Sequence, residues 1–241
     1  MIISGDNACL ACLIHNPSKV KEVLINKDKK ANYMKIIEKN NTIKNIRFID
    51  KKELQKIDKD NLRQSNDIVI RRDDYNPSSL QDICGLNKEN SIIVALDQLT
   101  DQNNLGNIIR TCLLAGVNGI IIPDHSSAPI TSSTANTSAG AIEILKFHIS
   151  KNLNRSLEEL KKNGYWTYAL DMKGKLITKD FKFDKKTILI LGNEGKGIRK
   201  NIINNSDFII SLPQEEISGI DSYNAANSLA MTLFHYKVNL L

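Results

Sequence analysis

The residues with the clearest chemical character lie in the segment GNEGKG, which begins at Gly192 and follows the apolar run Ile188–Leu191. Glycines allow a tight turn and close approach of the backbone to a ligand, because they carry no Cβ. A phosphate-binding P-loop needs a hydroxyl residue after its Gly-Lys pair, but here Gly197 follows Lys196. The order of the glycines also differs from the dinucleotide fingerprint. The segment therefore predicts either a tight structural turn or a ligand loop outside both nucleotide classes.

A second polar segment, Asp97–Thr111, follows an apolar strand and opens a predicted helix. Asn104 and Arg110 are six positions apart and so project from different angles of that helix. Arg110 lies beside Ile109 and ahead of further apolar residues, where a cation is costly unless a partner meets it. Arg110 therefore has one of two roles. It forms a structural ion pair with Glu194 or with an aspartate, or it takes part in catalysis.

A third polar segment begins where the strand-like run Phe208–Leu212 meets a proline. After a loop, Ser222, Tyr223 and Asn224 open a helix that is rich in small residues. Small residues let backbone or ligand pack closely. Ser222 and Asn224 are also both suited to cap the helix, so their types alone leave capping and chemistry open.

Hydrophobic periodicity predicts the elements that position these segments. From residue 91 onward, near-continuous apolar runs predict parallel strands at 92–96, 119–122, 165–170, 187–191 and 208–212. Helices are expected at 105–115, 133–144, 155–162 and 224–238. In residues 1–75 we expect helices at 8–13, 32–39 and 51–57, and strands at 20–25, 43–48 and 67–71. The fold class is α/β, with a small domain at 1–75, a linker at 76–90 and a parallel-sheet domain at 91–241. Ligands of such sheets bind at the carboxyl ends of the strands.

Composition narrows the class of protein. The 241 residues are 41% hydrophobic and 25% charged, typical of a soluble globular protein, and we expect a cytoplasmic location. Residues 1–75 carry 16 basic against 11 acidic residues, a surplus that favours a polyanionic partner or a merely solvated surface. Cys9 and Cys12 lack the second ligand pair of a zinc site, so no metal is expected.

In order, the three segments resemble the motifs of the TrmH/SpoU family of RNA ribose methyltransferases, in the SPOUT superfamily. The first motif is matched by Asp101, Asn104, Gly106, Arg110 and Thr111, and the second by Leu191, Gly192, Glu194, Gly195 and Gly197. The third is matched by Leu212, Pro213, Ser222 and Asn224, with Gln214, Tyr223 and Ala226 where the family usually has Met, Leu and Ser. The small-residue run 137–141 also fits the family. The layout before residue 80 is similar to the L30e-like domain of RlmB-type enzymes, with Arg63–Asn66 in place of the family's His-Gln-Gly.

The resemblance implies a trefoil knot in the C-terminal SPOUT domain and S-adenosylmethionine as methyl donor. It implies cofactor contacts from Leu191, Gly192, Gly197, Leu212, Gln214 and Tyr223. Catalytic roles carry over to Arg110, Asn104, Glu194, Ser222 and Asn224. The implied reaction is 2′-O-ribose methylation by a homodimer, with a guanosine of 23S ribosomal RNA as the expected target. A tRNA substrate and a non-catalytic RNA-binding protein are the alternatives.

Overall fold

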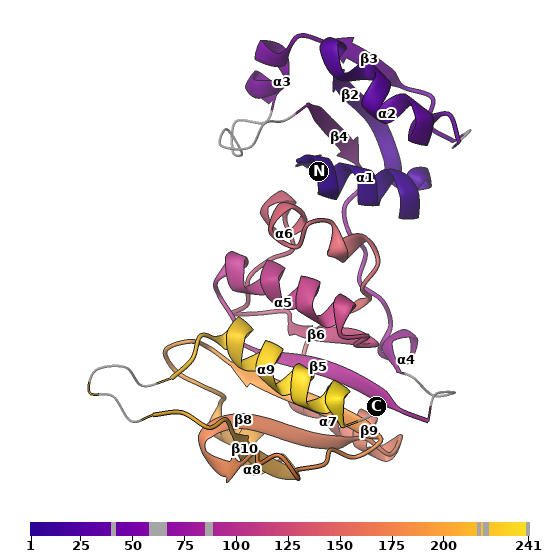
Figure 1. The fold of residues 1–241 in the computed structure, drawn as a ribbon. Coiled ribbons are helices and arrows are strands. Elements are labelled where there is room, and N and C mark those ends of the chain that lie inside the picture. The colour runs from indigo at the N-terminus through magenta and orange to yellow at the C-terminus, as the bar shows by residue number, and fades with distance from the viewer. Residues whose placement is uncertain (40–41, 58–66, 85–88, 216–217, 219–221, 240–241) are drawn as a thin grey trace. The chain divides into compact units, whose positions relative to one another are not determined.

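The computed structural model describes residues 1–241 except 40–41, 58–66, 85–88, 216–217, 219–221 and 240–241. Contacts divide the chain into two compact units. Met1–Asn76 and Pro129–Ile144 form the first unit, and Pro77–Ala128 and Leu145–Leu241 form the second. Each unit has its own sheet (Figure 1). The segment 129–144, which the sequence analysis gave to the C-terminal domain, thus packs with the N-terminal residues.

The first unit is built on a four-stranded sheet in the order β1-β4-β2-β3. Its strands are β1 (Ile2–Ser4), β2 (Val20–Asn26), β3 (Ile46–Ile49) and β4 (Ile68–Arg72). Its helices are α1 (Asp6–His15), α2 (Lys30–Ile37), α3 (Lys51–Ile57) and α6 (Ser132–Thr137). Strands β2 and β3 run parallel, whereas β4 is antiparallel to β1 and β2. The six predicted elements are confirmed, with shifted ends. Strand β1 was missed, because three residues are too few to show a period.

Gly140 interrupts the helix that was predicted at 133–144. Helix α6 ends at Thr137, and a separate 3₁₀ turn, η4, follows at Ala141–Glu143. Gly140 has a φ of +83°, and a Cβ at this position would lie 2.5 Å from the Cβ of Ala11. Only glycine combines this left-handed backbone with so close an approach to α1. The small-residue run 137–141 therefore packs inside the first unit.

Glu143 is a buried charge that ties the segment 129–144 into the first unit. Its carboxylate forms an ion pair with Arg72, and the two side chains are 0% and 3% exposed. Tyr75 donates a hydrogen bond to Oε1 at 2.6 Å, and Asn16 donates one to Oε2 at 2.8 Å. The Arg72 guanidinium also lies 3.8 Å from the centre of the Tyr75 ring. This set of partners compensates the desolvation of both charges.

The second unit is built on a six-stranded sheet in the order β10-β8-β9-β5-β6-β7, in which every pair is parallel. Its strands are β5 (Ser91–Asp97), β6 (Gly119–Pro123), β7 (Phe147–Ser150), β8 (Trp166–Leu176), β9 (Lys186–Gly192) and β10 (Phe208–Ser211). Its helices are α4 (Leu80–Ile83), α5 (Gln102–Leu114), α7 (Leu153–Lys162), α8 (Lys200–Asn204) and α9 (Ala225–Val238). The predicted parallel α/β fold is confirmed. Strand β7 and helix α8 were missed, the first because His148 and Ser150 interrupt its apolar run.

Part of the predicted linker at 76–90 is packed structure. Helix α4 lies within it, and a capping box between Ser79 and Asp82 begins that helix. Leu80 and Ile83 are buried in the main apolar cluster of the second unit. Local capping and two buried side chains therefore order a stretch whose composition favoured a linker. The segment Arg63–Asn66, which stands in place of the His-Gln-Gly of RlmB-type enzymes, lies outside the described residues.

In the part of the chain that the structure describes, no helix is long and apolar enough to cross a membrane. No group of His, Cys, Asp and Glu side chains in that part could hold a metal ion. Cys9 and Cys12 are both buried. Burial is the main cause that raises the pKa of the Cys12 thiol to about 12, so this group remains protonated at neutral pH.

We predict that Glu143→Gln lowers the free energy of unfolding by about 3 kcal/mol, because Arg72 would remain buried without a counter-charge. Glu53→Gln is the matched control. It removes an exposed carboxylate whose ion pair with Arg47 spans 3.7 Å, and we expect a cost of about 0–1 kcal/mol. Urea denaturation of both variants measures the difference. Equal losses of stability in the two variants would contradict this role of Glu143.

Candidate functional site

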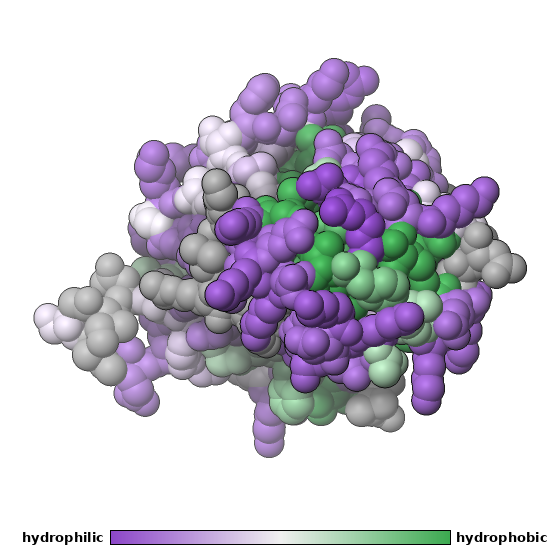
Figure 2. Space-filling view, turned by 90° about the horizontal axis from the view of Figure 1, so that it is seen from above, coloured by the Kyte–Doolittle hydropathy of each residue, from purple (hydrophilic) through white to green (hydrophobic). Residues whose placement is uncertain are grey.

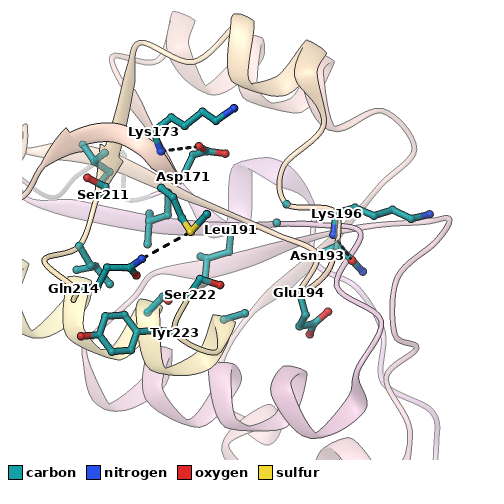
Figure 3. Close-up of a pocket in the computed structure, with 18 of the residues that line it drawn as sticks. Asp171, Lys173, Leu191, Asn193, Glu194, Lys196, Ser211, Gln214, Ser222 and Tyr223 are labelled. Carbon is teal, nitrogen blue, oxygen red and sulfur yellow. Dashed lines mark hydrogen bonds between the residues drawn. The ribbon is translucent and has the colours of Figure 1, made fainter. Parts of the chain in front are cut away.

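A pocket of about 390 Å³ lies at the carboxyl ends of strands β8 to β10 in the second unit. Its walls come from residues 170–173 of β8, the end of β9 with the loop up to Gly197, the end of β10 with Leu212 and Gln214, and residues at and just before the start of α9. Figure 3 shows Asp171 and Lys173 on one side, Glu194 and Lys196 on the loop, and Gln214 and Tyr223 on a further side. The volume is in the range of small-molecule sites.

The glycines of the loop serve its own folding. A Cβ on Gly192 would lie 2.2 Å from the carbonyl carbon of Gly197, because the loop turns back and pairs Asn193 with Gly197. Gly197 has a φ of +68°. A Cβ on Gly195, in contrast, would meet its nearest atom, Oδ1 of Asn193, at 3.7 Å, which is an ordinary van der Waals contact. Gly192 is therefore required for the close approach of backbone to backbone within the loop.

The side chain of Asn193 holds the turn of this loop. Its Oδ1 accepts hydrogen bonds from the backbone N–H groups of Gly195 and Lys196, at 3.0 and 3.1 Å. Its Nδ2 donates to the carbonyl of Gln98 at 2.9 Å. The loop is thereby fixed to the residue that follows β5. The amide of Asn193 was not singled out in the sequence.

A buried ion pair closes the base of the loop. Asp97 is the last residue of β5, and its side chain is 0% exposed. Its Oδ1 accepts a hydrogen bond from Nε of Arg199 at 2.8 Å and lies 2.6 Å from Nη2 in the ion pair. Its Oδ2 accepts from the Arg199 backbone N–H at 2.8 Å. A carboxylate so buried needs these charge-assisted bonds. The Arg199 guanidinium therefore neutralises the Asp97 carboxylate, and the bonds to Asp97 hold the C-terminal end of the glycine loop in place.

Three predicted site residues form one chain of hydrogen bonds. Asn224 donates from Nδ2 to Oδ1 of Asn104 at 3.0 Å, and Asn104 donates from Nδ2 to Oε1 of Glu194 at 2.8 Å. The Oδ1 of Asn224 accepts from the backbone N–H of Ala226 at 2.9 Å. Each amide orientation is thus fixed by its neighbours. The start of α5, the glycine loop and the start of α9 meet at this point, as the three motifs predicted.

Asn224 is also the N-cap of α9. The capping role that the sequence left open between Ser222 and Asn224 therefore belongs to Asn224. Ser222, Tyr223, Leu212 and Gln214 line the pocket, together with Leu191, Gly192, Gly197 and Glu194. The Tyr223 hydroxyl donates to the Pro213 carbonyl at 3.3 Å, and the Gln214 amide lies 3.8 Å from the Met172 sulfur.

Arg110 lies outside this arrangement. It is exposed, and among the described residues it has no ion pair and does not line the pocket. The expectation of an arginine surrounded by apolar side chains is wrong, because the neighbouring Ile109 points into the core while Arg110 faces out. The suggested ion pair with Glu194 is also absent, since Glu194 accepts from Asn104 instead. Arg110 shares its exposed helical face with Leu114, one turn further along α5.

The sequence analysis missed one wall of the pocket, the bulge at residues 170–174 of β8. The pairing of β10 with β8 jumps from Ile209–Ala169 to Ile210–Lys175, so five residues of β8 leave the ladder. Gly174 closes the bulge, since a Cβ there would lie 2.5 Å from the Ile210 backbone. Bulges often re-aim side chains beside functional sites. The sequence offered one signal, Gly174 within an otherwise strand-like run.

Comparisons with known proteins identify the family of this chain. The profile of the SpoU rRNA methylase family matches residues 91–234. An uncharacterized tRNA/rRNA methyltransferase from Borreliella burgdorferi is 40% identical over 156 residues, which cover 64% of this chain and 68% of the relative. A putative TrmH family tRNA/rRNA methyltransferase from Staphylococcus haemolyticus is 34% identical over 148 residues, or 61% of this chain and 58% of that protein. The match thus spans less than two thirds of the staphylococcal relative.

Two crystal structures have the same fold over the full chain. The SpoU methyltransferase AviRb from Streptomyces viridochromogenes, in complex with AdoMet, has a TM-score of 0.82 at 20% identity and covers 100% of this chain and 90% of its own. An RNA 2′-O ribose methyltransferase has a TM-score of 0.74 at 15% identity and covers 100% and 89%. This chain belongs to the SpoU rRNA methylase family, a class of RNA methyltransferases that use S-adenosylmethionine.

The pocket fits this methyl donor. It combines apolar walls for an adenine ring, from Leu191, Ile210 and Leu212, with backbone groups of the glycine loop. Two carboxylates on its rim, from Asp171 and Glu194, suit a cofactor that carries positive charge. No metal ligand set lies among the described residues, and methyl transfer from a sulfonium needs none.

We predict that Gly192→Ala weakens the binding of S-adenosylmethionine by about tenfold or more, because a methyl group at 2.2 Å from the Gly197 carbonyl carbon forces the loop to shift. Gly195→Ala adds the same group where the nearest atom lies at an ordinary contact distance, and we expect a much smaller effect. Isothermal titration calorimetry measures both affinities. Similar losses in both variants would show that ligand contact, not loop closure, explains these glycines.

Proposed function

We propose that this protein transfers a methyl group from S-adenosylmethionine to a ribose 2′-hydroxyl of RNA, with a guanosine of 23S ribosomal RNA as the target. The observation that carries the proposal is the hydrogen-bonded chain from Asn224 through Asn104 to Glu194, at the rim of a pocket suited to the cofactor. The crystal structure of an RNA 2′-O ribose methyltransferase with the same fold supports ribose chemistry. The cytoplasm is the proposed place of action.

The residues of this chain have three tasks in that reaction. When bound, S-adenosylmethionine supplies an electrophilic methyl group on a sulfonium. Leu191, Gly192, Leu212 and Tyr223 hold the cofactor in the pocket, with Gly197 and Gln214 beside them. Asn104 and Glu194, fixed by Asn224, orient the ribose, and Ser222 completes the wall. Alignment of the reacting atoms by these groups lowers the barrier by several kcal/mol.

Arg110 has the task of stabilising the ribose oxygen as it loses its proton. A guanidinium remains protonated and cannot serve as a base, so it acts through its charge on the developing alkoxide. An RNA phosphate or a water accepts the proton. This role needs Arg110 beside the reacting ribose, but Arg110 does not line the pocket of its own chain.

In a homodimer, Arg110 can act at the pocket of the second copy. Arg110 shares the exposed face of α5 with Leu114, which is 78% exposed. Helix α5 packs against α9, whose outer face carries Met231, Phe234 and Val238, and Phe234 is 70% exposed. Apolar side chains so exposed on two adjacent helices favour burial against a second copy. We infer that each Arg110 serves the pocket of the partner chain.

The first unit is proposed to bind the RNA. Lys27, Lys29 and Lys30 follow β2, and Lys51 and Lys52 follow β3, so these exposed lysines meet at the carboxyl ends of two paired parallel strands. Phe48 is 39% exposed beside them, with the Lys30 ammonium 4.8 Å from its ring centre. Cations with an accessible aromatic ring suit a polynucleotide. In the view of Figure 2, hydrophilic residues cover most of the visible face.

The remaining family expectations are part of the same proposal. We infer a trefoil knot in the region that ends with α9, and an L30e-like role for residues 1–75. A tRNA substrate is the alternative target. A non-catalytic RNA-binding role is disfavoured because the sequence contains all five expected catalytic residues, Asn104, Arg110, Glu194, Ser222 and Asn224.

We predict that purified protein converts guanosine in 23S ribosomal RNA to 2′-O-methylguanosine, and that Arg110→Ala slows this by about 100-fold or more while the affinity for S-adenosylmethionine stays the same. Nucleoside analysis of the RNA and calorimetry with the cofactor measure the two quantities. Lys146→Ala, which removes an exposed cation bonded to the Asp82 carbonyl, is the control. Near-normal turnover of Arg110→Ala would remove this residue from the mechanism, and methylation of tRNA alone would reassign the substrate.

We predict that the double variant Leu114→Asp, Phe234→Asp is a monomer at micromolar concentration, whereas the unaltered protein is a dimer, because two charges cannot be buried in an apolar interface. Analytical ultracentrifugation measures the mass. The exposed pair Ile14→Asp, Phe48→Asp in the first unit is the control and should leave the mass unchanged. A monomeric wild type would contradict the proposed exchange of Arg110.

A further inference from the structure

The bulge at residues 170–174 brings a second carboxylate to the pocket, in addition to Glu194. Leu170, Asp171, Met172 and Lys173 all line the pocket, although they belong to a strand that is otherwise paired on both sides. The bulge is closed by Gly174 against the Ile210 backbone. It therefore presents its side chains from a fixed frame. In Figure 3 the carboxylates of Asp171 and Glu194 lie on different sides of the pocket.

Asp171 lacks a counter-charge among the residues that the structure describes. Its side chain is half-buried and accepts one hydrogen bond, from the backbone N–H of Lys173 at 3.0 Å. None of the described residues forms an ion pair with it. Three other carboxylates whose side chains are at most 23% exposed, those of Asp97, Glu143 and Asp207, are each paired with an arginine or a lysine. A partly desolvated carboxylate on a pocket wall has lost hydration free energy that no cation compensates. A cationic ligand in the pocket would supply that compensation.

We propose that Asp171 is the counter-charge for the positive charge of the bound cofactor and so determines its preference for S-adenosylmethionine. This inference rests on the proposed function, since it assumes that cofactor. S-adenosylmethionine carries a sulfonium and an α-ammonium group, while S-adenosylhomocysteine keeps only the ammonium. 5′-Methylthioadenosine carries neither charge. A carboxylate that pairs with either cation thus discriminates charged ligands from the neutral one.

The test measures the affinity of three ligands for the full-length protein by isothermal titration calorimetry. In Asp171→Asn the amide oxygen can still accept from the Lys173 N–H, so the bulge keeps its turn. We expect S-adenosylmethionine to bind about tenfold more weakly, as for a partly solvated charge pair, and 5′-methylthioadenosine to bind as before. The affinity for S-adenosylhomocysteine, which has the ammonium but not the sulfonium, shows which of the two cations Asp171 contacts. Unchanged binding assigns Asp171 to the sulfonium, and a tenfold loss assigns it to the ammonium.

Two further variants complete the design. Asp171→Glu keeps the charge and should recover most of the affinity. Asp180→Asn removes an exposed carboxylate further along the chain and outside the pocket, and it should change none of the three affinities.

An equal loss for 5′-methylthioadenosine in Asp171→Asn would overturn the proposal, because it would place Asp171 against the adenosine. Unchanged binding of S-adenosylmethionine, or the same loss in Asp180→Asn, would also overturn it. Failure of the unaltered protein to bind S-adenosylmethionine would instead reject the proposed function, and this inference with it.

Discussion

The parallel pairing of β5 with β9 is the constraint on which the site depends. Their register sets Asp97 opposite Gly192, so both strands deliver their last residues to the same edge of the sheet. The loop after Gly192 then turns back on itself, and Arg199 returns to pair with the buried Asp97. Backbone pairing and one ion pair thus fix the loop before any ligand contact is made. The strand pairing and the ion pair between Asp97 and Arg199 therefore determine the shape of the loop side of the pocket.

The site is assembled from amides and carboxylates with distinct tasks. Asn193 holds the loop, and the chain from Asn224 through Asn104 holds Glu194. Asp171, in contrast, is held only by a backbone N–H and keeps its charge available. The amide side chains thus hold the pocket rigid, while the Asp171 carboxylate on its wall forms no ion pair with the described residues. Arg110 is exposed beside apolar side chains, and the proposed dimer depends on this position.

The first unit shows how chain order and packing can differ. Residues 129–144 follow β6 of the second unit, yet they pack with residues 1–76. Glu143 and Gly140 decide this, one through its ion pair with Arg72 and the other through contact with α1. Neither partner is near in sequence. A boundary drawn from composition alone could therefore not separate the segment from its neighbours.

The sequence by itself determined the parallel α/β fold and the order of three polar segments at strand ends, because buried strands and motif spacing are local properties. It also specified Asn104, Glu194 and Asn224, which do meet. Only the tertiary structure decided that Arg110 faces outward, that Asp97 binds Arg199, and that Asp171 lines the pocket. These depend on helix rotation, on partners about 100 residues apart and on a register jump in β8. A pattern along one strand or helix contains none of that information.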